Sequence, residues 1–334
     1  MRKILTGIIF LAALAGVWIA AFSVRTFTVE NDSELPLVPM KQEATLLFVG
    51  DIMLSRNVGR LMATKEDPHF PFLKVASSTE AASLTFGNLE NPVSERGVRS
   101  GSIYSFRADP ARTTEALLFA GIDVVSLANN HIWDYGRRAF IDTYEVLEKN
   151  GIGAAGAGPD YAWAHRPVVR SVGATDIAYL AYTNLLPKWL GLASSTPAAA
   201  RYDDETLRND IAKAKEEADV VAVSFHWGDE YETVHNAEQE RVAKLAIDAG
   251  AKIIVGHHPH VVQKVEEYNG GLILYSLGNF VFDQNFSKDT KRGLAVEVRL
   301  SGEEIVGFTK KEVAFTKDFQ PYFVEQQKQG DAAN

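Results

Sequence analysis

The stretch KIIVGHHPH, residues 252–260, runs from an apolar segment directly into three histidines within four positions. Its first part, Lys252–Val255, predicts a short buried strand, because Ile-Ile-Val is apolar and β-branched and a glycine follows. Three histidines at the end of a strand have few structural uses, whereas neutral imidazole is a common metal ligand. We therefore interpret residues 256–260 as part of a metal site.

Four other apolar strands are predicted to end in the same way. Each is followed by Asp, Glu, Asn or His, usually beside a glycine that lets the backbone turn sharply and the polar side chain face inward. Helix-like stretches separate these strands, which is typical of mostly parallel strands packed on helices. Because the carboxyl ends of such strands share one edge of the sheet, the polar side chains are expected to meet there. The strands and the residues after them are Thr45–Val49 with Asp51, Ser83–Phe86 with Asn88 and Glu90, Asp123–Leu127 with Asn130, His131 and Asp134, and Asp219–Phe225 with His226, Asp229 and Glu230.

The last third of the chain has a different pattern. From His260 onward, apolar segments are joined by short turns such as Asn269-Gly270, which predicts antiparallel strands. Val168–Val172 and Asp176–Tyr182 predict a further hairpin. We expect an α/β fold of four layers, with two β-sheets packed face to face and helices on both outer faces. The other predicted elements are strands His260–Tyr268, Gly271–Ser276, Gly293–Leu300 and Ile305–Ala314, and helices Thr113–Ala120, Phe140–Lys149, Asp203–Ala218 and Asn236–Ala249.

Composition narrows the chemistry of the site. The chain has 334 residues, no cysteine and eight histidines, so a metal would be held by His, Asp, Glu, Asn or backbone oxygens. This ligand set favours Mn, Fe or Zn. Lysine plus arginine, 34, minus aspartate plus glutamate, 43, gives a net charge of −9. Such a charge excludes nucleic acid or an anionic membrane surface as a partner bound through surface charge.

The N-terminus predicts a membrane segment. Ile4–Val24 carries no charge, follows Arg2 and Lys3, and is long enough to cross a bilayer core of about 30 Å. The basic start predicts a single-pass transmembrane anchor over residues 1–25, with a cytoplasmic N-terminus and an extracytoplasmic domain at the cell membrane. A signal peptide cleaved near Ala13–Ala15, giving a secreted protein, is the alternative. The remaining chain is expected to divide into a polar linker at 26–43, one domain at 44–324 and a polar tail at 325–334.

Six ordered motifs resemble the capsule-synthesis CapA family, also called poly-γ-glutamate synthesis proteins. They extend over residues 45–315, which is almost all of the predicted domain. The resemblance implies a role in making, exporting or anchoring poly-γ-glutamate, an anionic polymer, with membrane-bound capsule synthase subunits as partners. The matching stretches are FVGDIML (48–54), FGNLENP (86–92), SLANNHIWDYG (126–136), SFHWGDEY (224–231), VGHHPHVVQKVE (255–266) and LYSLGNFVFD (274–283).

This family is in turn similar to the calcineurin-like metallophosphoesterases. That similarity implies a double β-sandwich flanked by helices, with a dinuclear site for divalent ions such as Mn, Fe or Zn. Met53 stands where the metallophosphoesterase pattern has a histidine, which would weaken the binding of one ion. Asp134 is offset from the acidic position that follows the Asn130–His131 pair. The implied ligands are Asp51, Glu90, Asn130, His226, His258 and His260.

These residues suggest metal-assisted hydrolysis or acyl transfer, with water activated by the metal as the nucleophile. His131 would be the general acid or would stabilise the oxyanion, and Asp134 would orient it. For Asp229 and Glu230 a solvated acidic loop is the alternative. The additional candidates for the site are His257, Asn88, Asp229, Glu230, Asn279 and Asp283, and candidate contacts of an anionic polymer are Arg56, Arg107 and Lys188.

Two other functions stay open at this stage. A non-catalytic polymer-binding or scaffold subunit of the capsule machinery would use the same site to hold metal or polymer. A phosphoesterase acting on an unrelated envelope substrate would agree with the similarity to metallophosphoesterases. Because a net charge of −9 repels poly-γ-glutamate, binding that polymer requires a local basic groove.

Overall fold

The computed structural model describes residues 43–100, 102–187, 190 and 196–325. The predicted anchor, the linker up to residue 42, Lys188 and the tail after Glu325 lie outside the described residues. Within the described part of the chain, no helix is long and apolar enough to cross a membrane. The described residues belong to one compact unit, whose first strand begins at Glu43, the last residue of the predicted linker.

The first β-sheet is half parallel and half antiparallel. Its strands run in the order β16-β15-β14-β1-β2-β3-β4, and β13 also pairs with β1. Strands β1 to β4 are parallel neighbours and β13 is parallel to β1, whereas β14, β15 and β16 add an antiparallel ladder to the other side of β1. The bounds are β1 Glu43–Ile52, β2 Leu84–Leu89, β3 Val124–Ser126, β4 Gly153–Ala155, β13 Asn279–Val281, β14 Arg292–Ser301, β15 Glu304–Phe315 and β16 Pro321–Phe323.

The second β-sheet has a parallel centre and two antiparallel edges. Its order is β11-β12-β10-β9-β7-β6, in which β12, β10, β9 and β7 are parallel neighbours. The predicted hairpin forms the edge pair β6–β7, and β11–β12 forms the other edge. The bounds are β6 Val168–Val172, β7 Thr175–Thr183, β9 Val220–His226, β10 Ile253–His257, β11 Val265–Tyr268 and β12 Gly271–Leu274, and a separate short pair joins β5 Ala157–Gly158 to β8 Ala198–Ala199.

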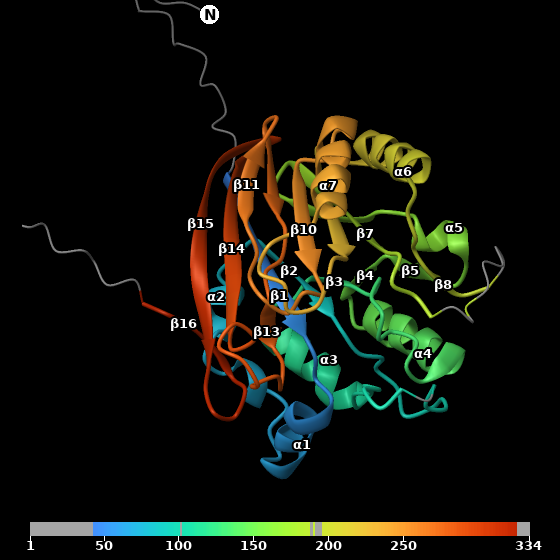
Figure 1. The fold of residues 1–334 in the computed structure, drawn as a ribbon, viewed down its shortest axis with the longest axis vertical. Coiled ribbons are helices and arrows are strands. Elements are labelled where there is room, and N and C mark those ends of the chain that lie inside the picture. Colours follow the sequence, from blue (N-terminus) through green and yellow to red (C-terminus); the bar gives the residue numbers. More distant parts are fainter. Residues whose placement is uncertain (1–42, 101, 188–189, 191–195, 326–334) are drawn as a thin grey trace, which may run out of the picture. The chain divides into compact units, whose positions relative to one another are not determined.

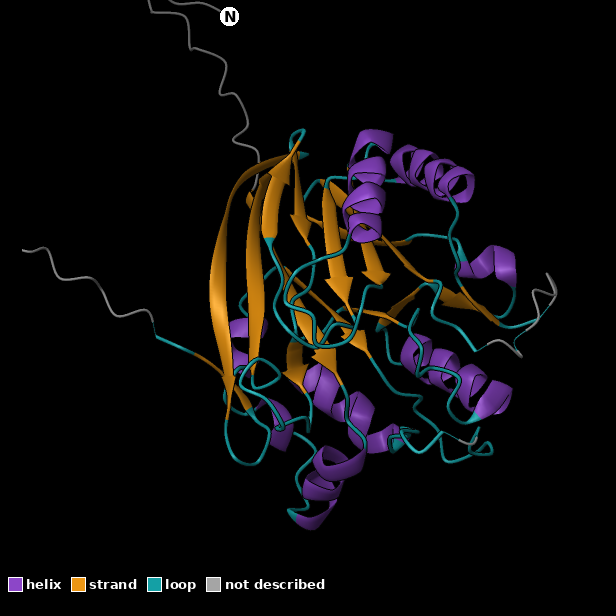
Figure 2. Ribbon diagram, in the orientation of Figure 1, coloured by secondary structure: helices purple, strands orange, loops and turns teal. Residues whose placement is uncertain are grey.

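Helices cover the outer face of each sheet (Figure 2). Helices α1, α3 and α4 contribute buried side chains to the core on the first sheet, and α6 and α7 do so on the second. For α3, α6 and α7 the sequence supplies the N-cap: Asp109, Asp203 and Asn236 accept backbone hydrogen bonds at the helix starts, whereas Tyr135 before α4 makes no such bond. The bounds are α1 Arg56–Thr64, a 3₁₀ turn at Phe70–Phe72, α2 Ala76–Thr79, α3 Pro110–Phe119, α4 Gly136–Lys149, α5 Tyr161–Ala164, α6 Asp204–Glu217 and α7 Ala237–Ala249.

Alternation along the strands produces three apolar cores. In β1, Leu46 and Phe48 pack between the two sheets, whereas Leu47 and Val49 face the helices α1, α3 and α4. Successive strand residues point to opposite faces, so a strand buried on both sides must be apolar throughout. The predicted layered α/β fold is therefore confirmed, and the apolar runs seen in the sequence are explained by two buried sheets.

The structure differs from the predicted elements in one segment near the site. Residues His260–Tyr268 were expected to form a strand, but β11 begins only at Val265. His258 and His260 have φ angles of 96° and 57°, which a β-ladder cannot accommodate. The backbone instead forms a loop that carries the histidines away from β10. Helix α1 and the short strand β13 were also not predicted.

Candidate metal centre

The strand ends of both sheets meet at one place. Strands β1 and β10 point toward the same edge of the described unit in Figure 1. In the first sheet Asp51 on β1 is paired in register with Asn88 on β2, and also with Asn279 on β13. In the second sheet His257 on β10 is paired with His226 on β9. Parallel pairing therefore brings together residues that lie up to about two hundred positions apart in the sequence.

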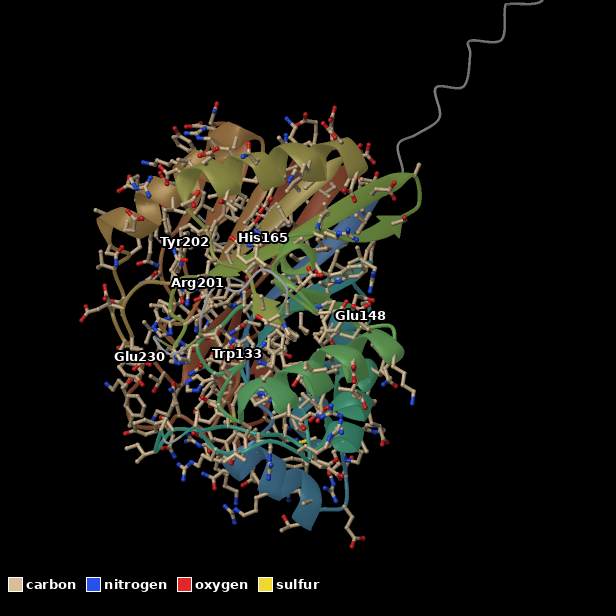
Figure 3. The ribbon with its side chains drawn as sticks, turned by 90° about the vertical axis from the view of Figure 1, so that its right-hand side faces the viewer. Trp133, Glu148, His165, Arg201, Tyr202 and Glu230 are labelled. Atoms are coloured by element: carbon tan, nitrogen blue, oxygen red, sulfur yellow. The ribbon has the colours of Figure 1, made fainter. Side chains whose placement is uncertain are left out.

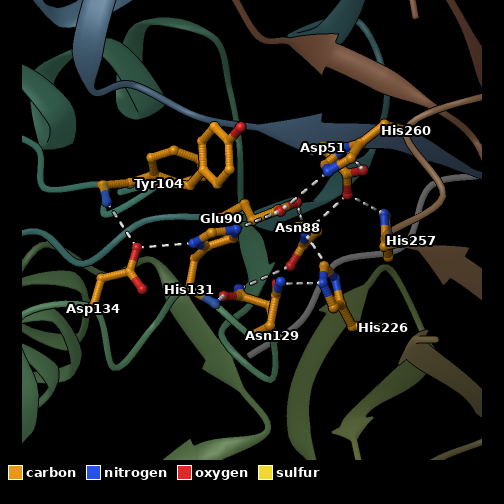
Figure 4. A network of polar contacts seen from close by, with 12 residues as sticks. Asp51, Asn88, Glu90, Tyr104, Asn129, His131, Asp134, His226, His257 and His260 are labelled. Atoms are coloured by element: carbon orange, nitrogen blue, oxygen red, sulfur yellow. Dashed lines mark hydrogen bonds and ion pairs between the residues drawn. The ribbon is translucent and has the colours of Figure 1, made fainter. Parts of the chain in front are cut away.

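Asp51, Glu90 and His260 form the most compact part of this centre. One ligand atom from each lies within 4.8 Å of the other two, and all three residues are buried. His260 Nδ1 is 3.1 Å from Asp51 Oδ2, and His260 Nε2 is 3.5 Å from Glu90 Oε1. His257 Nδ1 approaches the other oxygen of Asp51, Oδ1, at 3.2 Å. The two carboxylates and the imidazoles thus face one shared space (Figure 4).

Asn88 links the two carboxylates to the second sheet. Its Nδ2 donates hydrogen bonds to Asp51 Oδ1 at 2.9 Å and to Glu90 Oε2 at 3.1 Å, and it lies 3.4 Å from His226 Nδ1. Its side-chain oxygen accepts a hydrogen bond of 3.1 Å from Asn129 Nδ2. Asn129 also donates to the Leu89 carbonyl and accepts the backbone N–H of His131. The amide of Asn88 is therefore held in one orientation by its neighbours.

A second group of ligand-type atoms lies around His226. Its Nε2 is 2.8 Å from Asn130 Oδ1, and its ring centroid is 4.7 Å from that of His258. His226 and His258 are both buried, whereas Asn130 is partly exposed. An amide oxygen and two imidazoles are suitable ligands for a divalent ion. The arrangement thus places Asn130, His226 and His258 beside the Asp51–Glu90–His260 group.

His131 lies at the rim of the centre and is oriented by Asp134. Its Nδ1 is 2.8 Å from Asp134 Oδ2, and its Nε2 lies 3.8 Å from Glu90 Oε1. Asp134 is held in place in turn because its Oδ2 accepts the backbone N–H of Phe106 at 2.7 Å. The Phe106 ring stacks on His131 with a centroid distance of 4.0 Å. With 13% of its side chain exposed, His131 can be reached from outside.

The surroundings shift the pKa values of the two buried carboxylates in opposite directions. Burial raises the pKa of the Asp51 carboxyl, but the imidazoles of His257 and His260 outweigh burial and hold that pKa well below its usual range. Burial, together with the negative charge of Asp51, raises the pKa of Glu90 well above its usual range. Without a metal ion, the surroundings therefore favour the ionised form of Asp51 and the protonated form of Glu90.

The pKa values of His226 and His258 lie below their usual range. Burial, with the neighbouring His258, lowers the pKa of His226 well below its usual range. Burial, with His260, lowers the pKa of His258 to about 3. A neutral imidazole has a lone pair on one ring nitrogen, which is the form that binds metals.

Buried atoms without partners show that these residues suit a metal. Asp51 Oδ2, Glu90 Oε1, both ring nitrogens of His257 and His258 Nδ1 are buried and make no well-aligned hydrogen bond within the described chain. Unpaired buried polar atoms are costly, since each loses its hydration without compensation. A divalent cation among them would be coordinated by acceptors that make no well-aligned hydrogen bond to a protein donor. The donor set and its burial therefore fit a divalent metal ion.

Four of the predicted site residues lie outside this group or serve it indirectly. The carboxylate of Asp283 contacts Arg56 and accepts the backbone N–H of Asn57, so it holds the start of α1. Asn279 Oδ1 is 3.1 Å from His260 Nδ1, which positions the ring. Asp229 and Glu230 are exposed, and Asp229 accepts a hydrogen bond from Asn236. Figure 3 shows Glu230 apart from Trp133, the buried residue that follows His131 by two positions.

At Met53, where the metallophosphoesterase pattern has a histidine, this chain has an apolar contact. Met53 is buried against Phe106 and Phe282, and its sulfur accepts the backbone N–H of Ser55 at 3.2 Å. The thioether therefore packs beneath the ring that supports His131. Met53, the residue at which this chain departs from the metallophosphoesterase pattern, is thus an apolar support for Phe106.

The three remaining histidines have other partners. His69 stacks on Phe119, His235 stacks on Tyr275, and His165 Nδ1 is 2.6 Å from Asp210 Oδ2. Figure 3 shows His165 well separated from Trp133, near the segment that precedes α6. The division of the eight histidines into five at strand ends and three elsewhere therefore matches their positions in space.

Comparison with known proteins shows which family this chain is similar to. Residues 45–284 match the family described as bacterial capsule synthesis protein PGA_cap. The chain belongs to this family. As a PGA_cap protein it is 32% identical over 300 residues to the capsule biosynthesis protein CapA of Bacillus anthracis, which covers 87% of this chain and 72% of that protein. It is 36% identical over 244 residues to the PGA biosynthesis protein CapA of Bacillus subtilis, covering 72% of this chain and 64% of that protein.

A solved structure shares the fold of this PGA_cap chain. A phosphatase from Mycoplasma pneumoniae superposes with a TM-score of 0.51 and 14% identity, covering 82% of this chain and 95% of that one. At such low identity the likeness shows the fold alone. The predicted resemblance to the CapA family is confirmed, and the layered fold is shared with this phosphatase.

Sequence reasoning missed two residues that organise the PGA_cap centre. Asn129 orients Asn88 and the backbone of His131, and Phe106 supports both His131 and Asp134. Asn129 is adjacent to Asn130 in the quoted motif, so its position at a strand end could have marked it. Phe106 lies in an irregular segment without periodicity, and no sequence signal pointed to it.

Proposed function

We propose that the protein is a metal-dependent hydrolase or acyl transferase that acts on poly-γ-glutamate during capsule synthesis. The observation that carries this proposal is the buried Asp51–Glu90–His260 group with unpaired acceptor atoms, next to the oriented His131–Asp134 pair. Membership of the PGA_cap family supports the polymer, and the fold shared with a phosphatase supports hydrolytic chemistry. The proposal extends to one or two ions of Mn, Fe or Zn.

Each residue has a defined task in this proposal. A bound divalent ion supplies Lewis-acid polarisation and lowers the pKa of water. Asp51, Glu90 and His260 would hold one ion, and Asn130, His226 and His258 would hold a second. Asn88 and Asn129 keep the two carboxylates in position through the amide network.

His131 is the proposed proton donor. Because Asp134 faces Nδ1 of the imidazole, Nε2 is the atom left to exchange a proton with the substrate. This nitrogen lies on the Glu90 side of the ring and is close to the centre. Stacking on Phe106 fixes the plane of the ring, so the proton would be delivered in one direction.

The test combines metal analysis with turnover assays on the full-length protein. We expect bound metal in the parent protein and loss of that metal in the double variant His258→Ala/His260→Ala. Cleavage of poly-γ-glutamate with added Mn should be abolished by His131→Ala, while the metal content of this variant stays unchanged. Absence of bound metal in the parent would contradict the proposal. Polymer binding without turnover would instead assign a non-catalytic scaffold subunit.

A generic phosphodiester serves as the alternative substrate in the same assay. Turnover of this compound together with inertness toward poly-γ-glutamate would favour a phosphoesterase of another envelope substrate. Turnover of the polymer alone would favour the capsule reaction. The Asp134→Asn variant provides a matched control for His131, because it leaves the imidazole in place and removes only the charge that orients it.

Membrane attachment is a separate part of the proposal. We propose that residues 1–25 anchor the chain in the cell membrane with the domain outside the cytoplasm. The apolar run Ile4–Val24 and the preceding Arg2 and Lys3 support this arrangement. Membrane fractions washed at alkaline pH should retain the full chain, and added protease should digest the domain in intact spheroplasts. Recovery of a shortened chain in the medium would instead indicate a cleaved signal peptide.

A further inference from the structure

A small basic pocket lies next to the candidate metal centre. It has a volume of about 250 Å³ and lies between helices α1 and α3. Four arginines line it, namely Arg56, Arg60, Arg107 and Arg112, together with a single acidic residue, Asp109. In a chain of net charge −9, four arginines around one pocket are a marked local exception.

Two of these arginines have no carboxylate partner. Arg112 is 3.3 Å from Asp109, and Arg56 is paired with Asp283. Among the described residues, neither Arg60 nor Arg107 lies within ion-pair distance of a carboxylate. Arg60 donates to the side-chain oxygen of Asn57, and Arg107 donates to backbone carbonyl oxygens and stacks on Tyr135. Both side chains are exposed, so their charges are available to an external anion.

The backbone that carries these arginines is firmly held. Ser55 is buried, and its hydroxyl accepts the N–H of Arg107 and donates to the Arg107 carbonyl, both at 2.9 Å. Arg56 has a φ angle of 50°, an unfavourable region for a residue with a Cβ atom. Asp283 stabilises this conformation through the Asn57 N–H and the Arg56 guanidinium. The pocket is thus formed before a ligand arrives.

One aromatic ring connects the pocket to the proposed proton donor. The Arg56 guanidinium carbon lies 5.1 Å from the centroid of the Phe106 ring, and the same ring stacks on His131 at 4.0 Å. Arg107 follows Phe106 in the sequence and lines the pocket. A polymer bound by the arginines would therefore be separated from His131 only by the Phe106 side chain.

We propose that the Arg56–Arg60–Arg107–Arg112 pocket binds carboxylates of poly-γ-glutamate and aligns the polymer with the metal centre. This inference rests on the proposed function. Guanidinium groups bind carboxylates through paired, charge-assisted hydrogen bonds, and γ-linked glutamate has a free carboxylate on every unit. The acidic remainder of the protein repels the polymer, so binding is confined to this pocket.

The test is polymer binding by the full-length protein. Fluorescently labelled poly-γ-glutamate is titrated in the presence of a metal chelator, and its anisotropy is recorded. We expect the Arg60→Gln/Arg107→Gln variant to bind about tenfold more weakly than the parent, because two charge-assisted contacts are lost. The single variant Arg60→Gln should show a smaller loss in the same direction. Because both side chains are exposed, neither change is expected to disturb folding, which circular dichroism checks.

Arg208→Gln is the matched control. Arg208 is an exposed arginine on α6, on the outer face of the other sheet, so it should bind the polymer like the parent. A double variant that binds no more weakly than Arg208→Gln would overturn the proposal. Equal binding of a single-stranded DNA oligonucleotide of similar charge would also overturn it, since that result would indicate a surface without preference for carboxylates.

The polymer-binding test of the pocket can succeed or fail independently of the turnover test of the proposed function. Binding in chelator does not require the metal centre, so arginine-dependent binding without any turnover would leave the pocket assignment standing and reject the reaction. Turnover that depends on His131, together with polymer binding that ignores the arginines, would reject the pocket alone.

Discussion

Glu90 and Asp51 are two buried carboxylates that share one space, and this proximity determines how the centre responds to protons. Burial and the charge of Asp51 raise the pKa of Glu90 well above its usual range, which favours the protonated form of Glu90 in the metal-free chain. A divalent cation would remove the same repulsion. Protons and metal ions are therefore expected to compete at this residue.

We expect the metal affinity to decrease as the pH is lowered, because a proton on Glu90 competes with the metal and the raised pKa of Glu90 favours that proton. Calorimetric titration of Mn into the apoprotein, in two buffers of different ionisation enthalpy, measures the protons released. Glu90→Gln should bind metal more weakly and release fewer protons. Glu216→Gln, a change at an exposed position on α6, is the control, and an affinity independent of pH would contradict the expectation.

The positions of single site residues were predictable where a regular pattern carried them. Asp51, Glu90 and His226 follow apolar strands, and parallel pairing places such residues at one edge. Asn129 was not singled out, because an asparagine after a strand also fits a turn. Phe106 was missed because its role depends on tertiary contacts with His131 and Met53 that leave no trace in local sequence.

At the scale of elements, the glycines beside the site have a different role from the one expected. Gly50 and Gly256 were expected to permit sharp turns, but neither has a positive φ angle. They allow close approach of backbones instead. A Cβ atom on Gly256 would lie 1.9 Å from the Tyr275 carbonyl oxygen, and one on Gly50 would lie 2.0 Å from that of Gly278. The glycines themselves can be seen in the sequence. The backbone that packs against each of them is known only from the arrangement of the sheets.

Gly256→Ala is therefore expected to lower the free energy of unfolding by about 3 kcal/mol, because β10 must move away from Tyr275. The same movement displaces His257, so metal content should decrease as well. Gly151→Ala is the control: its Cβ would meet no atom within 4 Å, and only its φ of 78° makes alanine unfavourable, by about 1 kcal/mol. Equal losses in the two variants, measured by urea unfolding, would contradict the steric explanation.

Asp142 joins α4 to the segment before α3. Its carboxylate accepts hydrogen bonds from Arg96 and from the Ser94 hydroxyl. Burial raises the pKa of Asp142, but these hydrogen bonds lower it by more, and the net pKa lies below its usual range. A carboxyl whose pKa is lower in the folded chain stabilises the fold above its unfolded pKa of about 3.9 and loses this effect as the pH falls through the folded pKa.

Asp142→Asn should consequently destabilise the protein at pH 7 by about 1 kcal/mol or less, because Arg96 is largely exposed and its charge is screened. The difference between variant and parent should shrink as the pH approaches about 3. Urea unfolding at both pH values measures it. A difference of the same size at both would show that the carboxylate charge is not responsible.

Most strands and helices were predictable because their periodicity is strong, whereas irregular segments were not. The strands beginning near residues 45, 84, 124, 220 and 253 lie where they were expected, within a few positions. The segment from His260 to Lys264 was wrongly predicted as strand, since its apolar residues suggested β-structure and its positive φ angles could not be foreseen. Helix α1 was also missed, although Val58, Leu61 and Met62 in its sequence RNVGRLMAT have helical spacing.

At the scale of the whole molecule, packing between the two sheets holds the fold together. Phe86 on β2 stacks on Tyr179 on β7 with a centroid distance of 5.4 Å and an interplanar angle of 4°. Both side chains are buried in the core between the sheets. The two-sheet arrangement was predictable from the change of pattern along the chain. Which rings would meet across the interface was not, because side-chain registry between sheets has no signature in sequence.

Phe86→Ala should lower the free energy of unfolding by about 3–5 kcal/mol, because it leaves a cavity where the sheets meet. Val306→Ala, at a half-exposed position on β15, should change it by no more than about 0.5 kcal/mol. Denaturation followed by circular dichroism and by tryptophan fluorescence should give coincident transitions. A Phe86→Ala protein as stable as Val306→Ala would show that the sheets are joined mainly elsewhere.

The centre takes residues from both sheets: Asp51 and Asn88 come from the first, and His226 and His257 from the second. An ion bound between them would link the two sheets. The contribution of the ion to the free energy of unfolding would grow with the free ion concentration. It would reach about 2.7 kcal/mol when that concentration is a hundredfold above the dissociation constant. The stability of the folded chain would then follow the supply of trace metal, and depletion of metal would expose the protein to proteolysis.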